Sequence, residues 1–348
     1  MWVTSDLETA LTPTAIALGN FDGVHRGHQQ VVVPVVNLSK TYEPLNVALP
    51  VPEQQGWVDD VTVSASQEAS EITTIKDKNH IYKTVVTFNP HPQEFFTGQA
   101  RKLLTPMAEK VEQLRSLGVE QLVLLPFDRE LADLSPQQFV EKILIEELQA
   151  NWISVGCDFR FGKGRTGTSA DLQAIASSFG INVNTVPLQT CQGERISSSA
   201  IREALLQGEI TQANRLLGRA YTLSGKVVQG KQLGRTINFP TANLELPPEK
   251  FLPQTGVYCV RAYASHLTPL ASPIPAVMNI GKRPTVNGSS VTVEVHLLDW
   301  SGDLYGQTLT VSLEHFLRPE QKFDSLNALK EQIQADAAVA KTLLTIKQ

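Results

Sequence analysis

The alternation of strand-like and helix-like segments changes once along the chain, and this change constrains the fold most strongly. In the first part, apolar runs such as "TAIALGNF", "KTVVTFNPHP" and "EQLVLLPF" alternate with helical segments such as "TPMAEKVEQLRSLGV". Strands that alternate with helices predict a doubly wound parallel sheet, with ligands at the carboxyl ends of its strands. The first part is therefore expected to be an α/β domain.

From Tyr221 onward, short strands follow one another without helices between them. They read "YTLSGKVV", "GVYCVRAYA", "PAVMNI", "VTVEVHLL" and "TLTVSLEHF", and Gly, Pro and Asn turns separate them. This pattern predicts an all-β domain, a small antiparallel β-barrel. A terminal helix is expected after it, with Ser325 as N-cap. We therefore expect two domains, residues 1–219 and 220–348.

Helix signals are specific at two places in the first domain. Thr105 is the expected N-cap of a helix with Pro106 at its first position and Gly118 as its end. Ser135 and Gln138 form an expected capping box. The segment "ISSSAIREALLQGEITQANRLLG" predicts two short helices before the barrel.

Two segments disturb the regular pattern. A helix is expected after His28, yet "VVVPVV" is β-branched and contains Pro34, which predicts a short or kinked helix. Residues 43–80 are rich in Ser, Thr, Glu, Asp and Gln and have little periodicity. We interpret most of this stretch as a surface insertion.

Composition excludes several classes of protein. No apolar run approaches the ~20 residues of a membrane helix, and "MWVTSDLETA" does not read as a secretion signal. The cysteines, Cys157, Cys191 and Cys259, are widely spaced, which favours a reducing cytoplasm over a disulfide framework or a zinc site. The net charge of −5 argues against a broad nucleic-acid surface. A cytoplasmic enzyme is the first expectation.

The stretch "GNFDGVHRGHQQ" contains the first candidate site. His25 and His28 lie three residues apart where a strand ends and a helix begins, and Gly27 leaves room for a ligand to approach the backbone. The free N–H groups of a helix start favour an anion, and two imidazoles add donors for phosphate oxygens. A metal site would need a third ligand, which is not visible locally. The strand–turn–helix context favours a nucleotide site over two unrelated histidines.

A family resemblance rests on an ordered set of motifs. "GNFDGVHRGH" resembles the His-x-Gly-His signature of the nucleotidyltransferase superfamily. "TFNPHPQEFF", "LLPFDRELADLSPQQFV", "VGCDFRFGKGRTG" and "ISSSAIREAL" follow it, and then "GRTINFPTANL", "NIGKRPTV", "VEVHLLDWSGDLYG" and "LRPEQKFDSLNALKEQI". This order resembles the prokaryotic bifunctional riboflavin kinase/FAD synthetase family over nearly the whole chain apart from the insertion.

The resemblance implies the fold and both activities. The first domain would be a Rossmann-like nucleotidyltransferase that adenylylates FMN to FAD and releases pyrophosphate. The barrel would be a kinase that phosphorylates riboflavin to FMN. Each step would use ATP and Mg²⁺, so the expected partners are these small molecules, with no nucleic acid and no membrane. Whether the chain forms a homo-oligomer is left open.

The resemblance also implies the residues of the adenylylation site. His25 and His28 would bind the triphosphate and stabilise charge as the bond breaks, with donors from "RISSSAIR" on the far side. The residues expected to bind nucleotide or flavin are Gly19, Asn20, Phe21, Asp22, Phe88, Pro90, His91, Asp158, Arg195, Ser198 and Arg202.

Two of these segments also have simpler interpretations. The serines 197–199 read equally well as a helix N-cap cluster, and "NPHP" as a rigid turn. The glycine-rich loop with Arg160, Lys163 and Arg165 suits a mobile segment near phosphates.

The kinase site is expected in the barrel. "GKVVQGKQ" nearly matches a P-loop, but Gln232 replaces the hydroxyl residue and the context is not helical, so the P-loop is rejected. We interpret Gly230 and Lys231 as part of a glycine-flexible loop over ATP. Thr241 and Asn243 are one residue apart, point the same way in an extended segment, and offer hard oxygen ligands for Mg²⁺. Without the family context they would read as an ordinary turn.

The strand "VTVEVHLL" would carry the base of the kinase. Its valines at 291, 293 and 295 and Leu297 share one face, and Glu294 and His296 share the other. The resemblance makes Glu294 the general base for the riboflavin 5′-hydroxyl, with His296 as the second candidate. Arg318 in "LRPEQKFDSL" and the last helix would cover the flavin, by resemblance alone.

Three other functions compete with this interpretation. The first is a nucleotidyltransferase for another phosphate substrate, which the barrel motifs disfavour. The second is a flavin-binding or regulatory protein that has lost one or both activities. The third is a nucleic-acid-binding barrel, which the acidic balance disfavours.

Overall fold

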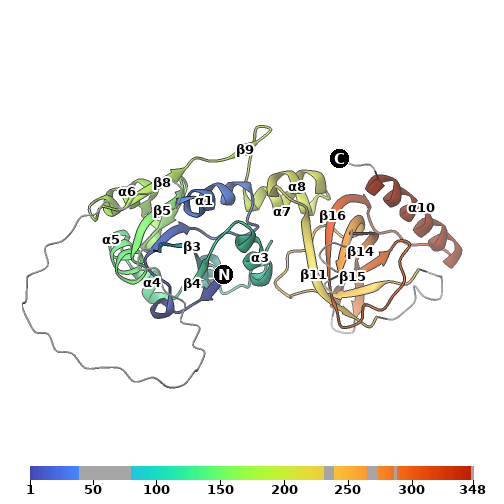
Figure 1. Ribbon diagram of the computed structural model, residues 1–348. Helices are drawn as coiled ribbons and strands as arrows, with labels where there is room; N and C mark the ends of the chain where they lie inside the picture. The colour runs from blue at the N-terminus through green and yellow to red at the C-terminus, as the bar shows by residue number, and fades with distance from the viewer. Residues whose placement is uncertain (39–79, 231–238, 265–272, 286–287, 346–348) are drawn as a thin grey trace, which may run out of the picture.

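The computed structural model describes residues 1–38, 80–230, 239–264, 273–285 and 288–345. Figure 1 shows a sheet domain and a barrel side by side, with two helices between them. The expected insertion, residues 43–80, lies outside the described residues except for His80. Among the described residues, no helix has the length and hydropathy needed to cross a bilayer.

The first domain contains a six-stranded sheet in the order β1-β4-β3-β2-β5-β8. All five strand pairings in it are parallel. The strands are β1 (Trp2–Thr4), β2 (Thr14–Leu18), β3 (Tyr82–Asn89), β4 (Gln121–Pro126), β5 (Ala150–Gly156) and β8 (Asn182–Val186). Because β3 and β5 flank β2 on opposite sides, the strand order reverses beside β2, which opens a crevice for a ligand at the carboxyl ends.

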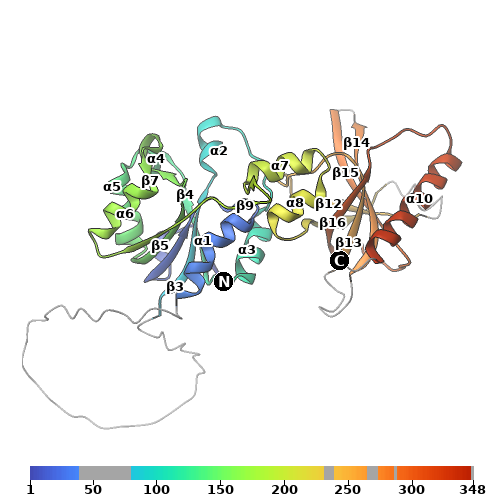
Figure 2. The same cartoon turned by 90° about the horizontal axis from the view of Figure 1, so that it is seen from above.

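Alternate residues of the central strand face opposite cores. Ala15 and Ala17 pack toward α1 (Arg26–Val36) and α3 (Met107–Ser116), whereas Ile16 and Leu18 pack toward the π-helix η3 (Phe139–Glu147) and α6 (Ser169–Ser177). Figure 2 shows α1 and α3 on one side of the sheet and α6 on the other. The predicted doubly wound sheet is confirmed.

The remaining elements of this part are short. They are η1 (Leu7–Thr9), α2 (Pro92–Thr97), α4 (Arg129–Asp133), α5 (Pro136–Gln138) and η4 (Lys163–Arg165), with the paired strands β6 (Arg160–Phe161) and β7 (Gly167–Thr168), and β9 (Thr190–Cys191) and β10 (Glu194–Arg195).

The second domain is a closed antiparallel barrel in the order β11-β12-β15-β14-β13-β16. Its strands are β11 (Tyr221–Val228), β12 (Ala242–Glu245), β13 (Gly256–Ala264), β14 (Ile274–Thr285), β15 (Gly288–Leu297) and β16 (Thr308–Arg318). Five of them contain the predicted strands, and β12 was not predicted as one. The terminal helix α10 (Leu326–Thr345) covers the barrel, and Ser325 accepts the Ala328 N–H at 3.2 Å, as expected of its N-cap.

Two helices, α7 (Ser198–Leu206) and α8 (Ile210–Leu217), join the sheet domain to the barrel, as predicted. Their apolar side chains share one buried cluster with the interior of the barrel. The architecture changes between α8 and β11, and residues 1–219 and 220–348 remain our proposed domains.

One local prediction is wrong, and a second is narrowed. Helix α3 begins at Met107, with Pro106 in the N-cap position; Thr105 accepts the Gly23 N–H at 2.9 Å, so its hydroxyl serves a buried turn instead. The second concerns the helix after His28, which was expected to be short or kinked: α1 continues through Pro34 over 11 residues, so it is not short, and the kink stays a prediction. Pro34 has no N–H to donate to the Gln30 carbonyl, four residues earlier. Gln30 is exposed, so water can take the place of the missing donor.

The predicted apolar face of β15 is only partly buried. Val291 is 44% exposed, whereas Val293 and Val295 are 3% and 0% exposed. Val291 pairs with Lys282 near the end of the hairpin, outside the barrel interior, so the buried face begins only at Val293. The predicted capping box is confirmed: Ser135 and Gln138 bond reciprocally at the start of α5.

Candidate active sites

A cavity of about 820 Å³ opens at the reversal of strand order in the sheet. This volume suits a cofactor-sized ligand. The lining includes eleven of the residues predicted for the adenylylation site, namely Gly19, Asn20, Phe21, Asp22, His25, His28, Phe88, His91, Asp158, Arg195 and Ser198. Pro90 and Arg202, which were also predicted, are not among the lining residues.

The two histidines stack at the start of α1. His25 is the N-cap, and its Nδ1 accepts the His28 N–H at 3.2 Å. The ring centroids of His25 and His28 lie 3.6 Å apart, 15° from parallel. Since Nδ1 of His25 accepts a hydrogen bond, the neutral ring carries its proton on Nε2.

Gly27 lines the cavity and also leaves space for a neighbouring side chain. A Cβ at this position would lie 3.2 Å from the His25 ring. The glycine therefore makes room for the imidazole, and the approach of a ligand to its backbone stays a prediction.

Burial keeps both imidazoles uncharged. Burial lowers the pKa of His25 from 6.5 to about 4, although Asp22 partly opposes this. Burial, followed by the charge of His25, holds the pKa of His28 well below its ordinary value. His28 Nδ1 is buried and has no hydrogen-bond partner among the described residues. The pair therefore offers N–H donors at neutral pH and gains charge only if an anion enters.

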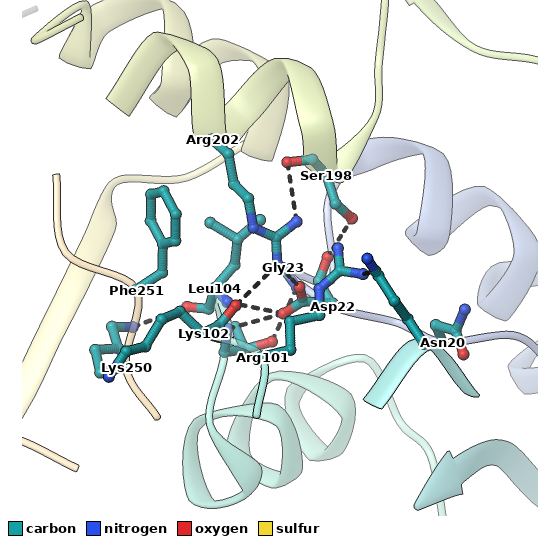
Figure 3. Close-up of polar contacts among 12 residues, drawn as sticks. Asn20, Asp22, Gly23, Arg101, Lys102, Leu104, Ser198, Arg202, Lys250 and Phe251 are labelled. Atoms are coloured by element: carbon teal, nitrogen blue, oxygen red, sulfur yellow. Dashed lines mark hydrogen bonds and ion pairs between the residues drawn. The ribbon is translucent and has the colours of Figure 1, made fainter. Parts of the chain in front are cut away.

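Asp22 organises the turn that precedes these histidines. It is 4% exposed, and its carboxylate accepts the Leu104 N–H at 2.8 Å and the Thr105 N–H at 3.3 Å. Arg202 from α7 forms an ion pair with the same carboxylate, and Ser198 donates to the Asp22 carbonyl at 2.7 Å (Figure 3). The structure thus brings Arg202 to Asp22 rather than to the cavity.

The serine cluster combines both of its interpretations. Ser197 caps α7 by accepting the Ala200 N–H at 3.1 Å. Ser198, the predicted ligand donor, lines the cavity while it bonds to Asp22. The cap interpretation thus accounts for Ser197, and Ser198 stays a predicted ligand donor.

Basic side chains also line the cavity. Arg195 pairs with Asp158 at 2.5 Å, and both line the cavity. Arg160 and Arg165 of the glycine-rich loop line it too, whereas Lys163 is absent from the lining and pairs with a carboxylate on α4. Two of the three predicted loop cations thus face the ligand space.

The "NPHP" segment is both a turn and part of the cavity wall. His91 caps α2, where its Nδ1 accepts the Gln93 N–H at 3.1 Å, and it also lines the cavity. Phe88 lines the cavity and packs edge-on against Phe127 at 5.6 Å between centroids. Pro90 is exposed. An apolar, aromatic wall of this kind suits a planar ring system.

Sequence reasoning missed two cations behind the histidines. Lys110 is 7% exposed and donates to the Asn20 carbonyl at 3.0 Å. Arg219 donates to the Gly23 carbonyl at 2.8 Å and the Val24 carbonyl at 3.3 Å. A lysine on the apolar face of the predicted helix was an available signal for Lys110; for Arg219 there was none.

The predicted kinase residues meet between β12 and β15. Thr241 donates to Glu294 Oε2 at 3.4 Å, and Asn243 lies directly opposite Glu294 in the ladder. Asn279 of β14, which the sequence reasoning missed, lies opposite Glu294 on its other side. A side chain at Gly230 would clash with the Asn243 amide, so the start of the predicted loop passes close to this group. Lys231 lies outside the described residues.

The other two barrel candidates have structural partners. His296 Nδ1 lies 2.9 Å from the Pro240 carbonyl, so this nitrogen donates its proton and cannot be the base. Arg318 bonds to Asp336 of α10 through Nη2 at 2.8 Å and Nε at 3.1 Å. In the part of the chain that the structure describes, no group of three or more His, Cys, Asp or Glu side chains could hold a metal.

Comparisons with known proteins cover both domains. A family model described as riboflavin kinase matches residues 217–344, and one described as FAD synthetase matches residues 7–53 and 67–200. The bifunctional riboflavin kinase/FMN adenylyltransferase of Escherichia coli K12 is 37% identical over 94% of this chain and 91% of its own length. Those of Haemophilus influenzae and Bacillus subtilis are 35% and 32% identical, each over 93% or more of this chain and 90% or more of their own length.

One solved structure matches both domains together. It is a crystal structure from Streptococcus pneumoniae described as a macrolide-efflux protein, with a TM-score of 0.77 and 29% identity over 97% of this chain and 98% of that one.

Proposed function

The chain belongs to the bifunctional riboflavin kinase/FMN adenylyltransferase family, and from this premise we propose which residues perform each of its two steps. The C-terminal barrel phosphorylates riboflavin, and the N-terminal domain converts FMN to FAD. Both activities use ATP.

The N-terminal step joins two anions, so it depends on positioning and on charge stabilisation. An oxygen of the FMN phosphate forms a bond to the α-phosphorus of ATP, the bond to the bridging oxygen breaks, and pyrophosphate leaves with the electron pair. We assign phosphate binding to His25 and His28 at the start of α1. The observation that carries this assignment is their stacked, uncharged pair on the wall of the cavity, with His25 buried and His28 partly buried.

The electrostatics support binding that is coupled to proton uptake. Burial is the main cause that lowers the pKa of both imidazoles, and a triphosphate would oppose it by favouring their charged forms. Protons would then enter the site with the nucleotide and neutralise part of its charge. On the aromatic side, Phe88 and His91 would contact the flavin ring.

The C-terminal step needs a base for the riboflavin 5′-hydroxyl. We propose that Glu294 accepts this proton as the oxygen bonds to the γ-phosphorus and ADP leaves. A hydroxyl and an amide oxygen, from Thr241 and Asn243, lie next to this carboxylate and suit Mg²⁺, which keeps most of its other ligands as waters and phosphates. When bound there, Mg²⁺ would neutralise charge on the ATP phosphates.

We place the enzyme in the cytoplasm, since its three cysteines are unpaired.

A time course with riboflavin, ATP and Mg²⁺, followed by chromatography of the flavins, tests the assignment. We expect FMN to appear first and then to be replaced by FAD. Glu294→Ala should abolish FMN formation and leave FMN-to-FAD conversion intact, and His28→Ala should do the reverse. Loss of both activities in either folded variant would contradict the two sites. Tight flavin binding without any conversion would favour a binding protein instead.

A further inference from the structure

The barrel places one charged side chain inside the adenylylation domain. Lys250, between β12 and β13, has a side chain with no exposed surface, and its ammonium lies 2.5 Å from the Glu109 carboxylate of α3. It also donates to the Leu104 carbonyl at 2.8 Å and lies 4.5 Å from the centroid of the Tyr221 ring. Taking such a pair out of water is costly, so its contribution to stability alone is a weak reason for its presence.

Backbone contacts reinforce this junction. The Leu103 N–H donates to the Glu249 carbonyl at 2.6 Å, and the Phe251 N–H donates to the Leu103 carbonyl at 2.8 Å. Lys102 donates to the Pro248 carbonyl. The barrel segment 248–251 therefore holds residues 102–104 of the first domain through main-chain and side-chain bonds together.

Leu104 and Thr105 bind the turn that precedes the histidines of the adenylylation site. The Leu104 N–H donates to the Asp22 carboxylate (Figure 3). The Thr105 N–H donates to the same carboxylate, and the Thr105 hydroxyl accepts the Gly23 N–H. His25 follows this turn by two residues. The chain of direct contacts thus runs from Lys250 through residues 103–105 to Asp22 and Gly23.

We infer that Lys250, a residue of the kinase domain, is a positioning residue for FMN adenylylation. It fixes the segment 103–105, and this segment fixes the turn that carries His25 and His28. The inference rests on the proposed role of those histidines. If the inference holds, the adenylylation site is complete only while the barrel is docked against the first domain. The kinase reaction itself does not need this contact.

The test compares three variants of the full-length enzyme. Lys250→Met removes the ammonium, Glu109→Met/Lys250→Met removes the whole pair, and Arg115→Met breaks an exposed ion pair with Glu112 on α3 as the control. The double variant is included because a lone buried carboxylate in Lys250→Met could impair folding, whereas an apolar pair of similar volume is often tolerated. FMN-to-FAD conversion and riboflavin phosphorylation are assayed separately, with kcat and KM for each.

We expect Lys250→Met to lower the kcat of adenylylation at least tenfold, with KM for FMN and both constants of riboflavin phosphorylation within twofold. The double variant should stay within threefold of Lys250→Met, because the Leu104 carbonyl loses its donor in both, and Arg115→Met should stay within twofold of the parent in both assays. Equal losses of both activities, or no loss in Lys250→Met, would overturn the inference. So would a double variant close to the parent, because the loss in Lys250→Met would then come from the unpaired Glu109 carboxylate and not from the lost bond to Leu104. His28→Ala is run in parallel: if it retains adenylylation, the proposed site fails independently of Lys250.

Discussion

At the scale of single residues, the adenylylation site depends on histidines that the fold keeps uncharged. His25 combines two roles, since one ring nitrogen caps α1 and the other is left to donate. The sequence predicted the pair and its place at a helix start, because strand, turn and helix signals all occur within a few residues. It did not predict that Gly27 accommodates the His25 ring, because the rotamer of a capping side chain is set by packing around it.

Titration of His25 makes stability depend on pH in a defined direction. The unfolded chain binds this proton below pH 6.5, whereas the folded chain binds it only near pH 4. The unfolded state therefore holds more protons in this window, so the free energy of unfolding falls as the pH drops from 6.5 to 4, by on the order of 3 kcal/mol from this group. Above pH 6.5 this group adds no pH dependence.

The variant His25→Asn isolates that contribution, since asparagine keeps an N-cap acceptor but does not titrate. Urea unfolding at pH 7 and pH 5 should show a smaller acid-induced loss in the variant than in the parent, by about 2 kcal/mol. His28→Asn serves as a comparison that should shift in the same direction. An identical loss in His25→Asn and the parent would mean that His25 is already charged in the folded protein.

At the scale of elements, the sequence predicted those with a strong local signal and missed those that tertiary contacts define. The capping box of α5 and the N-cap of α10 are local, and both are confirmed. Strand β12 has only four residues and follows Pro240, so its pattern is too short to distinguish from a turn. Thr105 has the expected sequence of a cap, yet a buried N–H at Gly23, 82 residues away in the chain, binds its hydroxyl.

That hydroxyl links two elements, so its removal should affect the turn between β2 and α1 rather than α3. Thr105→Val leaves the Gly23 N–H buried without its acceptor, which costs about 1–3 kcal/mol. We expect thermal unfolding at a lower temperature and a several-fold loss of adenylylation, with riboflavin phosphorylation within twofold of the parent. Thr105→Ser retains the hydroxyl and provides the control. If Thr105→Val and Thr105→Ser behaved alike, the bond to Gly23 would be dispensable.

At the scale of the whole molecule, the sequence position where the sheet domain gives way to the barrel differs from the position where one buried core ends and the next begins. The sheet domain ends its regular alternation before α7, and the barrel strands start at Tyr221. Hydrogen bonds tie the intervening helices to the barrel: Gln254 N–H donates to the Leu205 carbonyl at 3.0 Å, and the Asn214 amide donates to the Leu313 carbonyl at 2.8 Å. Sequence periodicity shows that α7 and α8 are amphipathic, but it cannot show which domain buries their apolar faces.

This arrangement predicts where the kinase can be separated from the rest of the chain. A fragment of residues 220–348 would lack the five Leu and Ile side chains that α7 and α8 bury, Ile201, Leu205, Ile210, Leu216 and Leu217. At roughly 1.5–3 kcal/mol for each such side chain, this loss rivals the whole stability of a domain. A fragment of residues 197–348 retains both helices and the cap at Ser197.

We therefore expect residues 197–348 to be soluble, to unfold cooperatively and to phosphorylate riboflavin within fivefold of the full chain. Residues 220–348 should aggregate, or unfold at a much lower urea concentration, because the barrel surface beneath α7 and α8 would be exposed. Gel filtration, urea unfolding and the kinase assay compare the two fragments directly. Equal stability and activity would show that the helices belong energetically to the sheet domain, and the shared core would then be an interface between two independently folded units.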